Sequence, residues 1–149
     1  MKHVIVIAEA GVNHNGSIDL AKKLVDAAAD AGADYVKFQT FKAENIASAG
    51  AKQADYQAKN TAKPESQLAM LKKLELSGED HAVLLDYCKN KKIKFLSTPF
   101  DIDSIDLLKD IGVTIGKIPS GDITNLPFLR KMAESFPELI LSTGMTTMD

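Results

Sequence analysis

The fold class follows from one stretch near the start of the chain, Val4-Ile5-Val6-Ile7-Ala8-Glu9-Ala10-Gly11-Val12-Asn13-His14-Asn15-Gly16. Its first part, 4–8, is aliphatic without polar and apolar alternation, so we predict a strand with both faces covered, as in a parallel sheet. A polar loop with two glycines follows, where a Cβ would block a turn. Ser17 then suits the N-cap of a helix. The stretch therefore predicts one strand–loop–helix unit.

The same unit recurs along the whole chain. Further short aliphatic runs lie at 35–39, 93–97, 114–118 and 139–142. Helical patterns separate the runs, and their predicted starts are near Ser17, residue 65, Ser77, Asp101 or Asp103, and Thr124. Alternation of strand and helix is the signature of a parallel α/β fold.

The helix that begins at Ser77 has the clearest local signals. Asp80 stands in the acidic position of a capping box. We expect the helix to leave His81 at the surface and to bury Val83, Leu84, Tyr87 and Cys88. Before it, residues 42–66 are rich in Ala, Lys, Gln and Asn, which predicts an exposed loop. Loops of this length after a parallel strand are often lids.

About five strand–helix units fit two architectures. One is a doubly wound sheet of flavodoxin type, with its chemistry at one or two switch points. The other is a (β/α)8 barrel of the TIM type that is incomplete here, since a whole barrel needs about 250 residues. A barrel gathers polar residues at the carboxyl ends of many strands, so the strand ends decide between the two.

Polar or small residues follow nearly every predicted strand. The residues with functional groups are Glu9, Asn13, Lys37, Gln39, Thr98, Lys117, Ser120, Asp122 and Ser142. Lysines at the ends of buried strands are costly unless they pair with an anion. Hydroxyls beside glycines and helix N-termini suit a small, multiply charged anion, and the carboxylates of Glu9 and Asp122 could move protons. This distribution over many strand ends favours the barrel.

Composition excludes several classes of function. The 149 residues have a net charge of −2 and a pI near 5.9, which argues against a nucleic-acid or membrane surface. No apolar run reaches the roughly 18 residues of a membrane span. The single cysteine, Cys88, cannot form an internal disulfide. We therefore expect a cytoplasmic α/β protein.

Five motifs resemble those of the N-acetylneuraminate (sialic acid) synthase family, in the family's order. They are Ile7 to Gly16, Val36-Lys37-Phe38-Gln39-Thr40, Ser97-Thr98-Pro99-Phe100, Lys117-Ile118-Pro119-Ser120-Gly121-Asp122 and Ser142-Thr143-Gly144-Met145. The resemblance implies an enzyme that condenses phosphoenolpyruvate with N-acetylmannosamine or a related N-acetyl amino sugar. It also implies that residues 1–149 are the N-terminal part of a synthase barrel, with the remaining strands and a C-terminal antifreeze-like domain absent.

The same resemblance assigns roles to the strand-end residues. Glu9 and Asp122 would be catalytic or would contact the sugar, although many relatives have Glu where Asp122 stands. The substrate-binding set would be Lys37, Gln39, Thr98, Lys117, Ser120, Ser142 and Asn13. His14 could either contact substrate or brace its own loop.

Cofactor and partner expectations also rest on this resemblance. A divalent metal, Mn²⁺ or Mg²⁺, is expected for the complete enzyme, with its ligands outside this chain, and the complete enzyme is expected to be a homodimer. Truncation would leave this chain without normal turnover. The alternative is a non-catalytic half-barrel module that binds phosphoenolpyruvate or a sugar phosphate. The identity of the N-acetyl sugar stays open.

Overall fold

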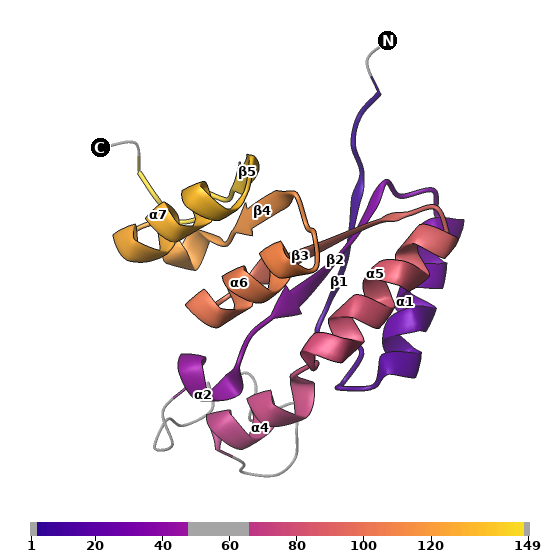
Figure 1. Cartoon of the computed structure of the whole chain (residues 1–149), viewed down its shortest axis with the longest axis horizontal. Helices are drawn as coiled ribbons and strands as arrows, with labels where there is room; N and C mark the ends of the chain where they lie inside the picture. Colours follow the sequence, from indigo (N-terminus) through magenta and orange to yellow (C-terminus); the bar gives the residue numbers. More distant parts are fainter. Residues whose placement is uncertain (1–2, 48–65, 148–149) are drawn as a thin grey trace.

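The computed structural model describes residues 3–47 and 66–147, which form an α/β fold with short parallel sheets (Figure 1). In chain order the elements are β1 (Ile7–Gly11), α1 (Ile18–Asp30), β2 (Tyr35–Thr40), α2 (Ala43–Ile46), α4 (Gln67–Leu74), α5 (Gly78–Asn90), β3 (Lys94–Pro99), α6 (Ile102–Asp110), β4 (Ile115–Ile118), the 3-10 helix η1 (Ser120–Asp122), α7 (Leu126–Ser135) and β5 (Glu138–Leu141). The predicted alternation of strand and helix is confirmed.

The strands follow one another in space in the order of the sequence. One parallel sheet has the order β1-β2-β3 and a second pairs β4 with β5, while β3 and β4 are in contact. A flavodoxin-type sheet would place β1 between β2 and β3. Here β2 occupies the central position, so the doubly wound alternative is wrong. Sequential order is the arrangement found in the wall of a barrel.

Helices cover one side of the strands. α1 and α5 pack side by side against the first sheet, and α6 and α7 lie together beside β3 and β4 (Figure 1). Alternate residues of β2 point into this helical layer, where Val36 and Phe38 are fully buried. Lys37 and Gln39 therefore point to the opposite side of the sheet. The fold thus separates an apolar layer from a polar one.

Several helix ends lie where local chemistry predicts them. Ser17 caps α1, and the capping box of Ser77 and Asp80 opens α5. Asp101, rather than Asp103, caps α6, and Asn125 caps α7 with Pro127 in its first turn. The predicted helix near 65–74 is confirmed as α4.

Other predictions were wrong. The first strand begins at Ile7 instead of Val4, because its neighbour β2 begins opposite Ile7 and residues 4–6 extend past the end of that partner. On α5, Val83 is exposed whereas His81 is completely buried; Leu84 and Cys88 are buried as predicted. Both faces of β5 were expected to be covered, yet Leu139 and Leu141 are exposed, since within the described residues no helix follows this strand.

Most of the predicted loop at 42–66 lies outside the described residues. Its first residues form α2, which contacts α4, and residues 48–65 lie outside the described part of the chain. None of the helices in the described ranges is long and apolar enough to cross a membrane.

Candidate functional site

A pocket of about 430 Å³ opens at the carboxyl ends of the strands. Its lining combines two lysines, a carboxylate, amides and hydroxyls: Glu9, Gly11, Val12, Asn13, Lys37, Gln39, Thr98, Phe100, Lys117, Pro119, Ser120 and Ser142. Eight of the nine predicted site residues are in this set. The structure therefore brings together groups that are more than one hundred residues apart in the sequence.

Glu9 and Lys37 form the first charged pair of the pocket. They occupy matching positions in the adjacent strands β1 and β2, and the Lys37 ammonium group makes an ion pair with Glu9 Oε2. The Lys37 side chain is largely buried, whereas that of Glu9 is half exposed. Next to them, Gly11 has a φ of +53°, and a Cβ there would lie 3.2 Å from Glu9 Oε1. Gly11 therefore leaves space for the carboxylate.

Gln39 and Thr98 occupy the next level of the same wall. They face each other in the register between β2 and β3, two residues beyond the level of Lys37. Thr98 is buried, at 3% exposure, and it lines the pocket. Together they add an amide and a hydroxyl to the side of the pocket that Lys37 occupies.

Lys117 supplies the second ammonium group, from β4. Its Nζ donates to Ser142 Oγ at 2.7 Å and to the Ile118 carbonyl at 2.8 Å. Burial lowers the pKa of Lys117, and the nearby charge of Lys37 lowers it further, while Glu9 acts in the opposite direction. The two lysines thus repel each other across the pocket, and a bound anion would relieve that repulsion.

Ser120 and Asp122 lie in the 3-10 turn after β4. Ser120 lines the pocket, and a Cβ at Gly144 would come within 3.5 Å of Ser120 Oγ, so the segment after β5 passes close to this hydroxyl. Asp122 is not part of the lining, and its Oδ1 accepts a hydrogen bond from Asn125 Nδ2 at 3.2 Å. Of the two predicted carboxylates, Glu9 lies in the pocket and Asp122 lies beside it.

The loop after β1 is braced from behind by His14. The His14 ring is fully buried, and its Nδ1 accepts a hydrogen bond from the Gly16 backbone N–H at 3.0 Å. Burial lowers the pKa of His14. Asn13, the preceding residue, lines the pocket. Of the two roles considered for His14, the geometry supports bracing of the loop.

Some lining residues carry no chemical signal in the sequence. Gly11, Val12, Phe100 and Pro119 shape the pocket; all four lie within the family motifs, and a turn was predicted at Gly11. No group of three or more His, Cys, Asp and Glu side chains within residues 3–47 and 66–147 could hold a metal ion. The described residues alone do not provide a metal site.

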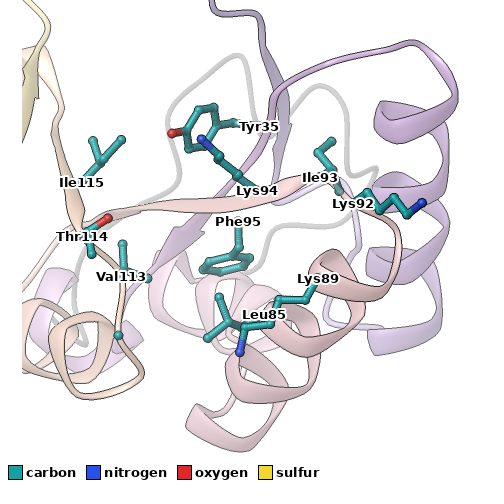
Figure 2. Close-up of a pocket in the computed structure, with 11 residues that line it drawn as sticks. Tyr35, Leu85, Lys89, Lys92, Ile93, Lys94, Phe95, Val113, Thr114 and Ile115 are labelled. Carbon is teal, nitrogen blue, oxygen red and sulfur yellow. The ribbon is translucent and has the colours of Figure 1, made fainter.

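A second pocket, of about 460 Å³, lies at the other ends of β3 and β4 (Figure 2). Lys94 lies over the ring of Tyr35 there, with 5.2 Å between Nζ and the ring centroid. Phe95 and Leu85 form an apolar wall below them. In barrels of this kind the chemistry lies at the carboxyl ends of the strands, so the pocket around Glu9 is the candidate site.

Comparisons with known proteins place this arrangement in a family. Residues 24–149 match the profile of the NeuB family. The chain is 57% identical over 148 residues to the N,N'-diacetyllegionaminic acid synthase of Campylobacter jejuni, covering 99% of this chain and 44% of that protein. It is 32% identical to the human N-acetylneuraminate-9-phosphate synthase, covering 97% of this chain and 40% of that protein.

Solved structures agree with these sequence matches. The N-acetylneuraminic acid (sialic acid) synthetase from Leptospira borgpetersenii, in complex with citrate, has a TM-score of 0.81 and 33% identity, covering 99% of this chain and 47% of that one. A truncated 3-deoxy-D-arabino-heptulosonate 7-phosphate synthase from Thermotoga maritima has a TM-score of 0.62 at 12% identity and covers 42% of that chain, so it shows the fold alone. The chain spans less than half the length of these relatives.

Proposed function

Because the chain belongs to the NeuB family, we propose that its pocket binds phosphoenolpyruvate and that the protein condenses this compound with an N-acetyl amino sugar. The observation that carries the proposal is the pair of ammonium groups, Lys37 and Lys117, in one pocket at the strand ends. The names of the relatives, as legionaminic acid and N-acetylneuraminate-9-phosphate synthases, favour a synthase over the non-catalytic binding module.

The pocket has separate groups for the two charged ends of phosphoenolpyruvate. Lys37, Gln39 and Thr98 lie on the wall made by β2 and β3. Lys117, Ser120 and Ser142 lie on the wall made by the ends of β4 and β5. We assign the phosphate and the carboxylate to these two clusters, since ammonium groups and hydroxyls together suit both anions.

The proposed reaction forms one carbon–carbon bond and releases one phosphate. C3 of phosphoenolpyruvate attacks the aldehyde carbon of the open-chain sugar, and the aldehyde oxygen takes a proton. Water adds at C2, and the bond from C2 to the phosphate oxygen then breaks, which leaves a 2-keto acid and inorganic phosphate. Fixing both reactants in one pocket supplies much of the rate enhancement.

Glu9 is placed to exchange protons during these steps. Its carboxylate lies in the pocket and is half exposed, so water or a sugar hydroxyl can reach it. Binding of an anion to Lys37 would compete with the ion pair and leave Glu9 free to accept a proton. Asp122 has a less direct part, because its side chain is held by Asn125.

A complete enzyme of this kind would include more than the described residues. The five strands would form the first part of a (β/α)8 barrel, with further strands closing it and a homodimer completing the sugar site. The expected Mn²⁺ or Mg²⁺ would take ligands outside the described residues. A chain of 149 residues would then bind phosphoenolpyruvate without sustained turnover.

The test begins with the intact mass of the natural gene product in its own cells. The purified protein is then mixed with phosphoenolpyruvate, Mn²⁺ and either N-acetylmannosamine or a diacetamido sugar. Phosphate release is followed together with the mass of the sugar acid that forms. Phosphate release that depends on the sugar supports the synthase. Tight, metal-independent binding of phosphoenolpyruvate without any phosphate release would favour the binding module instead.

A further inference from the structure

A network of buried, hydrogen-bonded polar groups lies directly behind the candidate site. Thr40, at the end of β2, has its hydroxyl oxygen 2.8 Å from His81 Nε2 and 2.7 Å from Ser97 Oγ. The His81 Nδ1 atom is 2.7 Å from the carbonyl oxygen of Ser77, the N-cap residue of α5. Thr40, His81 and Ser97 are at most 2% exposed. None of the three lines the pocket itself.

The Ser77 carbonyl oxygen, at one end of this network, fixes the direction of every hydrogen bond in it. A carbonyl oxygen can only accept, so His81 Nδ1 must carry a proton and donate it to Ser77. Burial lowers the pKa of His81, which favours the neutral ring, so Nε2 is then an acceptor. The Thr40 hydroxyl therefore donates to His81, and the Ser97 hydroxyl donates to Thr40.

The network lies next to two residues that line the pocket. Thr40 directly follows Gln39, and Ser97 directly precedes Thr98. Gln39 and Thr98 line the pocket, whereas Thr40 and Ser97 point into the helical layer. The hydrogen bond between Thr40 and Ser97 thus joins β2 to β3 behind the two pocket residues. His81 attaches that junction to the first turn of α5.

We propose that Thr40 is a positioning residue, which holds Gln39 and Thr98 in place for the anion through its hydrogen bonds to Ser97 and His81. The proposal rests on the proposed function for the identity of the anion, phosphoenolpyruvate. Backbone ladders alone fix the strand register. The last backbone bond of this pairing runs from the Phe100 N–H to the Thr40 carbonyl at 3.0 Å. The buried hydroxyls add a side-chain bond at the same end and so hold the two strand ends together.

Two substitutions at the same position test this role. Thr40→Val keeps the shape of the side chain and removes its hydroxyl, whereas Thr40→Ser keeps the hydroxyl. Tyr87→Phe is the matched control on the same helix, since it removes the hydroxyl that donates to Asp26 at 3.1 Å on the side facing α1. Urea denaturation of each variant identifies conditions in which all the proteins are folded.

Phosphoenolpyruvate affinity is measured by calorimetry under those conditions. We expect Thr40→Val to bind about threefold to tenfold more weakly, the range that one neutral hydrogen bond contributes. Thr40→Ser should restore most of the affinity, and Tyr87→Phe should bind as the unchanged protein does. Wild-type affinity in folded Thr40→Val would overturn the proposal, because a merely structural hydroxyl changes stability alone.

Nuclear magnetic resonance separates this proposal from the proposed function. The side-chain amide signal of Gln39 and the backbone amide signal of Thr98 should move in Thr40→Val and return toward their original positions in Thr40→Ser. If the unchanged protein fails to bind phosphoenolpyruvate, the proposed function fails, and these shifts still support positioning by Thr40. Unmoved signals would overturn positioning even where phosphoenolpyruvate binds.

Discussion

The ammonium group of Lys37 in β2 forms an ion pair with the carboxylate of Glu9 at the matching position of β1. The pair places a negative group inside a pocket that otherwise suits an anion. Such a carboxylate weakens anion binding, so a site that only binds an anion gains nothing from it. The pair therefore favours the proposed synthase over a module that only binds.

Replacing Glu9 separates binding from chemistry. In Glu9→Gln the carboxylate no longer competes for Lys37, so we expect phosphoenolpyruvate affinity to stay the same or to increase. The rate of phosphate release by the natural gene product should fall by about 100-fold or more, the usual contribution of a general acid or base. Titration calorimetry and a phosphate-release assay report the two effects separately. An unchanged kcat would remove Glu9 from the mechanism.

Lys117 should be indispensable for binding the anion. Its Nζ lies in the pocket beside Ser142, and loss of one charge-assisted hydrogen bond weakens binding by about tenfold to hundredfold. We therefore expect Lys117→Ala to lose most of its affinity for phosphoenolpyruvate. Lys89→Ala is the matched control, because this lysine lines the second pocket and pairs with Asp86. Equal affinity of the two variants would contradict the assignment of the site.

The lowered pKa of Lys117 gives the binding a pH dependence. Burial and Lys37 favour the neutral amine, whereas a bound anion favours the ammonium form, so binding raises this pKa and takes up protons. Above about pH 8 the phosphate has completed its ionisation near pH 6 and no longer changes its charge. The affinity for phosphoenolpyruvate should fall as pH rises from 8 to 10. This fall should begin at a lower pH than it would if the pKa of Lys117 were that of an ordinary lysine. Calorimetry in two buffers of different ionisation enthalpy measures the proton uptake, and zero uptake throughout this range would exclude the effect.

His14 and His81 should make the folded chain sensitive to mild acid. Burial lowers the pKa of both rings below 6.5, so the unfolded chain binds more protons between 6.5 and the folded pKa values. The free energy of unfolding is therefore highest above pH 6.5 and falls as pH decreases, by at most about 1.4 kcal/mol per pH unit for each histidine. Urea denaturation from pH 7.5 to 5 measures this slope. His81→Gln should reduce this slope, and an unchanged slope in that variant would contradict the prediction.

The sequence alone predicts most of the pocket, because its residues occupy the ends of strands that are locally recognisable. Parallel strands in a barrel point their carboxyl ends to one place, so Lys37 and Lys117 converge without any contact being known in advance. The environment of His81 could not be predicted in this way. Its partner Thr40 is 41 residues away, and only the folded chain shows that both ring nitrogens have hydrogen-bond partners inside the layer.

Strand register and turn geometry were also beyond local prediction. The aliphatic residues 4–6 have strong strand propensity, yet they precede the first residue of β1 that is in register with β2, and all three are exposed. Asp122 follows a predicted strand end as Ser120 does, but the 3-10 turn directs its side chain toward Asn125. Both outcomes depend on neighbours whose position the local sequence does not determine.

Gly16 connects the loop that carries Asn13 to α4. Its φ is +76°, and an added Cβ would lie about 2.1 Å from the Lys73 carbonyl oxygen, so a side chain cannot fit without moving one of the two backbones. Gly32 has the same φ of +76° and no atom within 4 Å of an added Cβ. The left-handed backbone destabilises both alanine variants by roughly 1–2 kcal/mol, whereas the clash with Lys73 destabilises Gly16→Ala alone. We expect Gly16→Ala to lose clearly more stability in urea denaturation. Because the loop must shift, Gly16→Ala should also bind phosphoenolpyruvate more weakly, whereas Gly32→Ala should not; equal behaviour of the two variants would show that contact with α4 does not hold the loop in place.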